Sequence, residues 1–356
     1  MATETQTGGS LYDEGGYGCV FTPPLLCANE KGVGATAGAT GPKQIDKLLK
    51  KEEADYEFSI ATAIQKIPLW RQYISVPESM CTPAPISKQT ETELASCKLI
   101  GSTPLGKMRL LRSVYAGVPL FQLKLNISTF SFYEFMVHLL EGVSLLNLYG
   151  VVHRDLHMGN ILVDRANVPR IIDFNLAVSV HDLAAAVEKV RIMYDPTLLQ
   201  VSPDWCLVSA VAAGKDAFTI MDDMFHRNTY YKTIQTLTGV EEAAQRASLE
   251  TFFEKSRSMQ AGDVELWFRN YWRLVDAWSV GACLAYLLAK LQLWPSFQRT
   301  DFKTHRALIL EVVRRLTAFN PLERIDSVQA LAMLNPDSYV LRKYGMAWLE
   351  KVGRLT

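Results

Sequence analysis

The sequence "GVVHRDLHMGNILVDRANVPRIIDFN" at residues 150–175 contains two short apolar runs separated by a turn-like patch. The first run is Ile161–Val163 and the second is Ile171–Ile172, and the turn-like patch between them extends from Arg165 to Pro169. Short β-branched runs joined through such a patch are typical of a β-hairpin. We therefore expect a buried hairpin at this point of the chain.

Three oxygen-bearing side chains flank this predicted hairpin. Asp155 and Asn160 precede its first strand, and Asp173 follows its second strand. The hairpin would bring Asp173 back beside Asn160, and amide and carboxylate oxygens are ligands that suit Mg²⁺. Asp155 lies one loop away, where it could accept a proton from an attacking hydroxyl. A metal on the phosphates and a base on the nucleophile are the requirements of phosphoryl transfer.

The length and composition of the chain indicate how large a core it can bury and what net charge it carries. The chain has 356 residues, of which 49% are hydrophobic, so it can bury the cores of two lobes. The 37 basic residues balance the 37 acidic residues, and the formal net charge is zero. Because no excess of either charge is present, we expect neither a nucleic acid nor a membrane as partner.

The cysteines and the N-terminus predict an intracellular, cytoplasmic protein. The six cysteines are scattered without a CxxC pair, which gives zinc binding little support and favours free thiols in a reducing compartment. The opening "MATETQTGGS" is polar and lacks the apolar core of a signal peptide. The apolar stretch 277–289 is too short to span a bilayer, so we expect a buried helix.

Hydrophobic periodicity divides the chain near residues 115–120. Before that point, strands alternate with one helix, and after it the pattern is mainly helical. The expected early elements are a flexible tail at 1–10, a hairpin at 11–22, a mobile loop at 27–42, a strand at 43–49, a helix at 50–67, a connector at 77–95 and a strand at 108–114. The expected later helices are at 130–150, 276–290 and 303–319, with further helical patterns over 205–270.

The motifs of residues 150–175 resemble those of the eukaryotic-type protein kinase superfamily. His153-Arg154-Asp155-Leu156 with Asn160 matches the H-R-D-L-x-x-x-N catalytic loop, and Asp173-Phe174-Asn175 resembles D-F-G. The resemblance implies an α+β, two-lobed protein kinase-like fold with a small β-rich N-lobe and a larger helical C-lobe. The N-lobe would span 11–115 and the C-lobe 116–356, with a helical insertion at about 205–270.

The same resemblance assigns residues to ATP binding. "DEGGYGCV" at 13–20 resembles the glycine-rich loop of kinases, although any glycine-rich hairpin could give this pattern. The resemblance places the backbone of this loop over the phosphates and the hinge near 113–117. The implied nucleotide-binding residues here are Gly15, Gly16, Gly18, Val20, Tyr115 and Ala116.

The phosphate-binding lysine is expected on the strand at 43–49. "QIDK" aligns best with the kinase V-A-I-K, which selects Lys47, although Asp46 stands where an apolar residue is usual. The alternative is that Lys47 is one solvated lysine among several. Its implied partner is Glu57 on the following helix, with Glu53 as second choice, and both glutamates could instead only favour the helix N-terminus.

Further motifs imply structural and regulatory roles. "DAWSVGACL" at 276–284 resembles D-x-W-S-x-G, in which Asp276 would anchor the catalytic loop backbone. Arg324 would pair with Asp204, which replaces the glutamate of A-P-E. Arg154 would dock a phosphorylated activation loop, with Thr197 as the chosen site, or would instead satisfy loop carbonyls.

The expected function is that of an ATP- and Mg²⁺-dependent serine/threonine protein kinase. Asp155 would act as base, Lys47 would contact the phosphates, and Asn160 and Asp173 would bind Mg²⁺. The partner is then a protein substrate with a Ser or Thr acceptor. The segment "GGYGCVFTPPLLC" at 15–27, with the predicted helix "KKEEADYEF" at 50–58, most resembles the Ser/Thr kinases of large DNA viruses that infect algae and protists, which implies the host cytoplasm or the virion.

Two departures keep other functions open. His157 stands where Ser/Thr kinases usually carry lysine, and Asn175 replaces the glycine of D-F-G. The pattern D-L-H-x-x-N also resembles small-molecule phosphotransferases of the same fold. The alternatives are therefore such a phosphotransferase, or a pseudokinase that serves as an interaction module.

Overall fold

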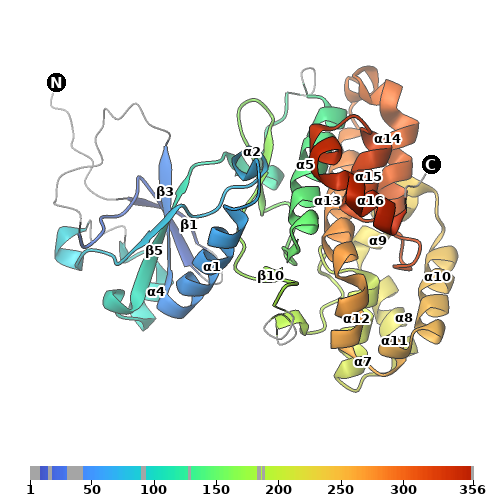
Figure 1. The fold of residues 1–356 in the computed structure, drawn as a ribbon, viewed down its shortest axis with the longest axis horizontal. Coiled ribbons are helices and arrows are strands. Elements are labelled where there is room, and N and C mark those ends of the chain that lie inside the picture. The colour runs from blue at the N-terminus through green and yellow to red at the C-terminus, as the bar shows by residue number, and fades with distance from the viewer. Residues whose placement is uncertain are drawn as a thin grey trace. The chain divides into compact units, whose positions relative to one another are not determined.

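The computed structural model describes residues 9–14, 18–29, 43–89, 94–126, 130–182, 186 and 189–353. The chain forms two compact units (Figure 1). The first unit comprises residues 1–68, 75–117 and 173–175, and the second comprises 69–74, 118–172 and 176–356. A β-sheet region therefore precedes a helical region, as in an α+β kinase-like fold.

The first unit is built on one five-stranded sheet in the order β1-β2-β3-β5-β4. Neighbouring strands are antiparallel, and β3 pairs with β5 along its whole length. The strands are β1 (Ser10–Glu14), β2 (Gly18–Thr22), β3 (Gln44–Lys50), β4 (Ser79–Cys81) and β5 (Met108–Val114). This confirms the predicted hairpin and the predicted strands at 43–49 and 108–114.

Helix α1 (Lys51–Ile64) follows β3 directly and packs against β3 and β5. Its buried residues Ala54, Glu57, Ile60, Ala61 and Ile64 recur at the three- and four-residue spacing of one helix face. Glu57 is the only charged member of that buried face. A carboxylate at such a position needs an opposite charge beside it, because burial of an unpaired charge is very unfavourable.

The predicted connector at 77–95 contains more structure than its composition indicated. It supplies β4 and the 3₁₀ turn η1 (Ile86–Lys88), and β4 is paired to β5. A strand of three residues is too short to show a period, so its proline- and serine-rich setting concealed it. Helix α4 (Lys98–Ser102) and the 3₁₀ turn η2 (Leu105–Lys107) lead into β5.

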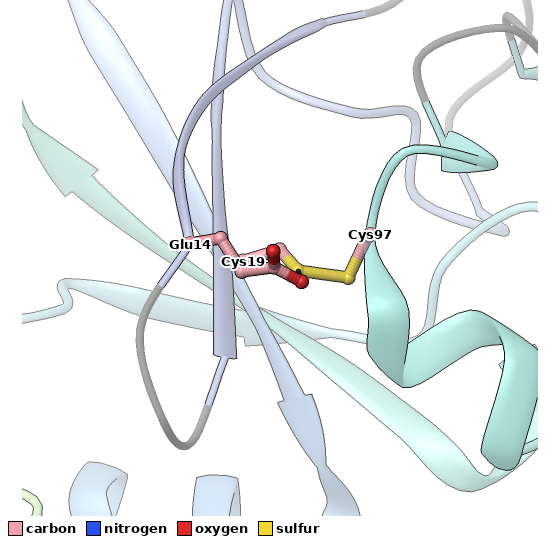
Figure 2. Close-up of side chains that lie close together, drawn as sticks. All are labelled: Glu14, Cys19 and Cys97. Carbon is pink, nitrogen blue, oxygen red and sulfur yellow. Dashed lines mark hydrogen bonds between the residues drawn. A yellow bond between two sulfur atoms is a disulfide. The ribbon is translucent and has the colours of Figure 1, made fainter.

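The prediction that the cysteines are free thiols is wrong for four of them. Cys19 is bonded to Cys97, and Cys27 is bonded to Cys81, with Cα separations of 6.1 and 5.9 Å. The partners are 78 and 54 residues apart in sequence, so local spacing could not reveal them. Glu14 lies beside the first disulfide (Figure 2), but sulfurs in a disulfide are not the thiolates that bind metals.

In the second unit, the long helix α5 (Phe132–Leu148) packs against α13 and α15. Ser131 caps the N-terminus of α5 by accepting a hydrogen bond from the Glu134 backbone. After α5 come β7 (Val151–Val152), β8 (Ile161–Val163), β9 (Pro169–Ile171) and β10 (Val178–Ser179). Strands β8 and β9 form the predicted hairpin. Strand β6 (Val118–Pro119) pairs with β8, and the 3₁₀ turn η3 (Leu120–Gln122) directly follows β6 in the chain.

Six helices fill the segment in which a helical insertion was expected. They are α7 (Pro203–Ala212), α8 (Ala217–Arg227), α9 (Thr229–Thr238), α10 (Glu242–Lys255), α11 (Arg257–Gln260) and α12 (Val264–Tyr271). The chain ends with α13 (Val275–Leu291), α14 (Phe302–Leu316), α15 (Ser327–Leu334), a π-helical turn (Leu341–Gly345) and α16 (Met346–Val352). The short helix α2 (Trp70–Tyr73) also belongs to this unit and packs against α5.

Helix α13 is the buried helix that the apolar stretch predicted. Fourteen of its 17 residues are buried. Together with α12 it forms a stretch, Val264–Leu291, that is long and apolar enough to cross a membrane. Because 83% of the apolar window in this stretch is buried inside the protein, it has the environment of a core helix.

Candidate active site

Lys47 lies at the centre of a charged network in the first unit. Strand β3 carries it between Val20 of β2 and Leu111 of β5. Its Nζ lies 2.9 Å from Oε2 of Glu57 and 2.7 Å from Oδ1 of Asp173. The structure thus brings together three predicted site residues from a strand, a helix and the segment after the hairpin.

Burial and charge act in opposite directions on Lys47. Burial by itself lowers the pKa of the Lys47 ammonium, but the carboxylates of Glu57 and Asp173 outweigh burial and hold the pKa above its ordinary value. Burial raises the pKa of Glu57, although the ammonium of Lys47 opposes this effect. We therefore expect Lys47 to stay charged at neutral pH.

Asp46, the residue that disagreed with the kinase pattern, has a structural partner. Its carboxylate is fully buried and receives two hydrogen bonds from Arg112, at 2.9 and 3.0 Å. The two residues face each other across β3 and β5, so strand register places them together. Sequence reasoning missed Arg112, and an acidic residue in an apolar strand was the signal that a cation lies opposite.

The glycine-rich segment is described in part. Gly15 and Gly16 lie outside the described residues, whereas Gly18 belongs to β2 opposite Leu49. A Cβ atom at Gly18 would lie 2.5 Å from the Leu49 side chain and 2.7 Å from the Leu48 carbonyl oxygen. Gly18 is therefore required for the close approach of β2 and β3, in addition to any role toward phosphate.

The predicted hinge follows the end of β5. The Tyr115 backbone N–H donates to the Lys43 carbonyl at 2.8 Å, and Ala116 is buried. The hydroxyl of Tyr115 lies 3.4 Å from that of Tyr12 on β1, and this contact raises the pKa of Tyr12 to about 12. Val20 is half-buried on β2 beside Lys47.

In the second unit, Asp276 fixes the backbone that precedes Asp155. Its two carboxylate oxygens accept the backbone N–H groups of His153 and Arg154, at 2.7 and 2.9 Å. Arg154 has a left-handed backbone, with φ of 70°, which these bonds help to hold. This contact confirms that Asp276 anchors the loop, as the D-x-W-S-x-G resemblance implied.

Asp155 is surrounded by hydrogen-bond donors. Asn160 Nδ2 donates to the Asp155 backbone oxygen at 2.8 Å and to its Oδ2 at 3.3 Å. Gln200 Nε2 donates to Oδ1 at 2.9 Å, a contact that sequence reasoning missed. His157 Nε2 lies 3.8 Å from Oδ2, and His157 Nδ1 accepts the Gly159 N–H.

The chemistry of Asn160 and Asp173 suits a hard cation. Because the amide nitrogen of Asn160 donates to Asp155, the remaining polar atom of this side chain is the Oδ1 oxygen, and amide oxygens are a ligand type that suits Mg²⁺. Asp173 supplies a carboxylate from a left-handed backbone position, with φ of 62°. Binding of Mg²⁺ by these two residues stays a prediction.

Arg154 satisfies loop carbonyls, which was the alternative to docking a phosphorylated activation loop. Its guanidinium donates to the backbone carbonyls of Leu176 and Lys189, and it lies over the Trp205 ring. The hydroxyl of Thr197 donates to Asp195 at 2.6 Å. The structure therefore shows Arg154 holding loop carbonyls, and phosphorylation of Thr197 stays a prediction.

Comparison with known proteins bears on the same segment. Residues 109–205 match the family model described as the protein kinase domain. The matched stretch contains Asp155, Asn160 and Asp173, and it begins after Lys47 and Glu57. This match supports a relationship to the eukaryotic-type protein kinase superfamily and indicates a phosphotransferase. No curated protein matches the chain.

Proposed function

We propose that the protein is an ATP- and Mg²⁺-dependent protein kinase that phosphorylates Ser or Thr hydroxyls. The observation that carries this proposal is the bonding of Lys47 to both Glu57 and Asp173. In protein kinases a strand lysine that pairs with a helix glutamate contacts the ATP phosphates. The kinase-domain match and the hydrogen-bonded Asp155 lend further support.

The proposed chemistry assigns one task to each group. Asp155 accepts the proton of the acceptor hydroxyl, whose oxygen forms a bond to the γ-phosphorus. The bond from that phosphorus to the β–γ bridging oxygen breaks, and ADP leaves. Lys47 neutralises phosphate charge, and Asn160 and Asp173 would hold the metal. When bound, Mg²⁺ neutralises the developing charge on the phosphate oxygens.

Transfer of ³²P from ATP onto a panel of proteins tests the proposal. We expect wild-type protein to label substrates in the presence of Mg²⁺, with phosphoserine or phosphothreonine in the hydrolysate. Asp173→Ala should abolish labelling, whereas the matched control Asp337→Ala, at an exposed aspartate, should retain it. Labelling that is equal in wild type and Asp173→Ala would refute the proposal.

A small-molecule phosphotransferase is the second candidate, because of His157. This residue lies near Asp155 where protein kinases usually present a lysine, and a neutral imidazole stabilises phosphate less than an ammonium does. A metabolite screen run beside the protein panel separates the two substrate classes. If neither class is labelled, a Mg-ATP thermal shift compared between wild type and Asp155→Asn tests the pseudokinase alternative.

The narrower assignments rest on the sequence motifs. We propose a protein substrate as partner, a relationship to kinases of large DNA viruses, and a site of action in host cytoplasm or virion. A reducing compartment disfavours disulfides, so the oxidation state of Cys19 and Cys97 in protein purified with thiols blocked tests the cytoplasmic assignment.

A further inference from the structure

Gln200 makes a contact with Asp155 that no kinase motif assigned. Its Nε2 donates to Asp155 Oδ1 at 2.9 Å, while Asn160 donates to Oδ2. Each oxygen of this carboxylate therefore receives one amide N–H. Two donors on two oxygens fix the rotation of the carboxylate about its side-chain bond, which a single donor would leave freer.

The backbone that carries Gln200 is attached to α13. The indole N–H of Trp278 donates to the Leu199 carbonyl at 3.0 Å. The hydroxyl of Ser279 donates to the Gln200 carbonyl at 2.7 Å. Both donors are buried, and they come from adjacent residues at the start of α13. Gln200 is therefore held at its backbone by a rigid element.

The same helix also fixes the backbone before Asp155. Asp276, two residues before Trp278, accepts the N–H groups of His153 and Arg154. One helix end thus sets the position of both partners in the contact between Gln200 and Asp155. A contact whose two sides share one rigid support is pre-organised, and pre-organised groups are those that contribute most to a transition state.

We infer that Gln200 is a positioning residue that aims the Asp155 carboxylate at the acceptor hydroxyl. This inference rests on the proposed function, in which Asp155 is the base. A glutamine suits the task because its neutral amide donates a hydrogen bond and cannot compete for the proton. The role is expressed in the rate of phosphoryl transfer and not in the binding of ATP.

Two variants separate hydrogen bonding from shape. Gln200→Glu keeps the size of the side chain but replaces the N–H donor by a negatively charged acceptor, and Gln200→Ala removes the whole contact without adding charge. We expect each to lower kcat about tenfold or more, as for the loss of one hydrogen bond to a charged group, with an unchanged KM for ATP. The matched control Gln235→Glu removes the amide donor that Gln235 directs at Gln245, and should leave kcat unchanged.

A second background tests whether Gln200 acts through Asp155. In Asp155→Ala, the further change Gln200→Ala should leave the residual rate unaltered, because its target is gone. A purely structural role would lower the rate by the same factor in both backgrounds, and this result would overturn the inference. A wild-type kcat in Gln200→Glu, or a raised kcat in Gln200→Ala, would also overturn it.

The assays distinguish this inference from the function on which it rests. If wild-type protein transfers phosphate and the Gln200 variants match it, only the positioning role fails. If wild-type protein transfers phosphate to no acceptor, the proposed function fails and the positioning role fails with it. Thermal unfolding of each variant shows whether a loss of kcat accompanies a loss of folded protein.

Discussion

Replacement of Arg324 by methionine should strongly destabilise the second unit. Arg324 Nη2 lies 2.8 Å from Oδ1 of Asp204, and both side chains are fully buried. This pair was predicted from the sequence and is confirmed. Removal of one partner from a buried ion pair costs about 3–5 kcal/mol, because the other charge is left buried without compensation.

The neighbours of the pair place the expected loss in the upper part of that range. Arg324 also donates to the backbone carbonyls of Ala318 and Phe319, at 2.8 and 3.3 Å, and these acceptors lose their donor as well. Asp204 keeps one hydrogen bond, from the Trp267 indole at 3.1 Å. We therefore expect a loss of about 4–5 kcal/mol in the free energy of unfolding.

Urea unfolding followed by tryptophan fluorescence measures this loss. All seven tryptophans lie in the second unit, so the signal reports its unfolding. A loss of this size corresponds to a decrease of about 8–20 °C in the melting temperature of a unit this large. The control Arg314→Met breaks a half-exposed pair with Glu311 and should cost less than about 1 kcal/mol.

A double-mutant cycle completes the test. Asp204→Asn combined with Arg324→Met removes both charges, and it should be less destabilised than the sum of the single variants by about 2 kcal/mol or more. A loss below about 1 kcal/mol in Arg324→Met, or strict additivity in the cycle, would refute the reasoning from burial.

Three further predictions concern acid stability, strand packing and thiol chemistry. Hydrogen bonds and charge from Arg314, and then from Arg315, lower the pKa of Glu311 to about 2. The Glu311 carboxylate therefore contributes fully to stability above its ordinary pKa of 4.5, and this contribution is lost as the pH falls toward 2. The stability difference between wild type and Glu311→Gln should therefore shrink over that interval in urea titrations, and a constant difference would contradict the assignment. Gly18→Ala should lower the free energy of unfolding by about 1–3 kcal/mol, because the added methyl group overpacks β2 on β3. Hydrogen exchange of the amides in these two strands measures this loss, and unchanged protection would show that the strands can move apart to accept the methyl group. Burial raises the pKa of Cys206 and Cys283 to about 12, so native protein should react slowly with iodoacetamide. Denaturation without reductant should release two reactive thiols and denaturation with reductant six, and six without reductant would exclude both disulfides.

The fold was predictable where one periodic signal covered a whole element. The strand at Met108–Val114 and the helix Phe132–Leu148 follow from apolar patterns of seven and 17 residues. The strand Ser79–Cys81 did not, because three residues carry no period and its pairing to β5 is decided by tertiary contact. Disulfide pairing was hidden for a similar reason, since it depends on the approach of distant segments.

The residues of the candidate site also differ in how well the sequence predicted them. Asp276 and its target backbone were predictable because a motif specifies both the residue and its role. Gln200 was not, because its role depends on a side chain reaching Asp155 from 45 residues away, and glutamine carries no charge that would mark it. Arg112 could not be predicted either, because only the register of β3 and β5 shows that it lies opposite Asp46.

The two disulfides are nested along the chain. The link from Cys27 to Cys81 lies inside the ring closed by Cys19 and Cys97, and both rings contain the strand and helix that carry Lys47 and Glu57. A protease cut anywhere between residues 28 and 80 would therefore leave its two products joined by two covalent bonds. Such nicked protein would migrate as one species on a non-reducing gel and as two fragments after thiol treatment, so in an oxidising setting a single backbone cut could not separate Lys47 from the rest of the chain.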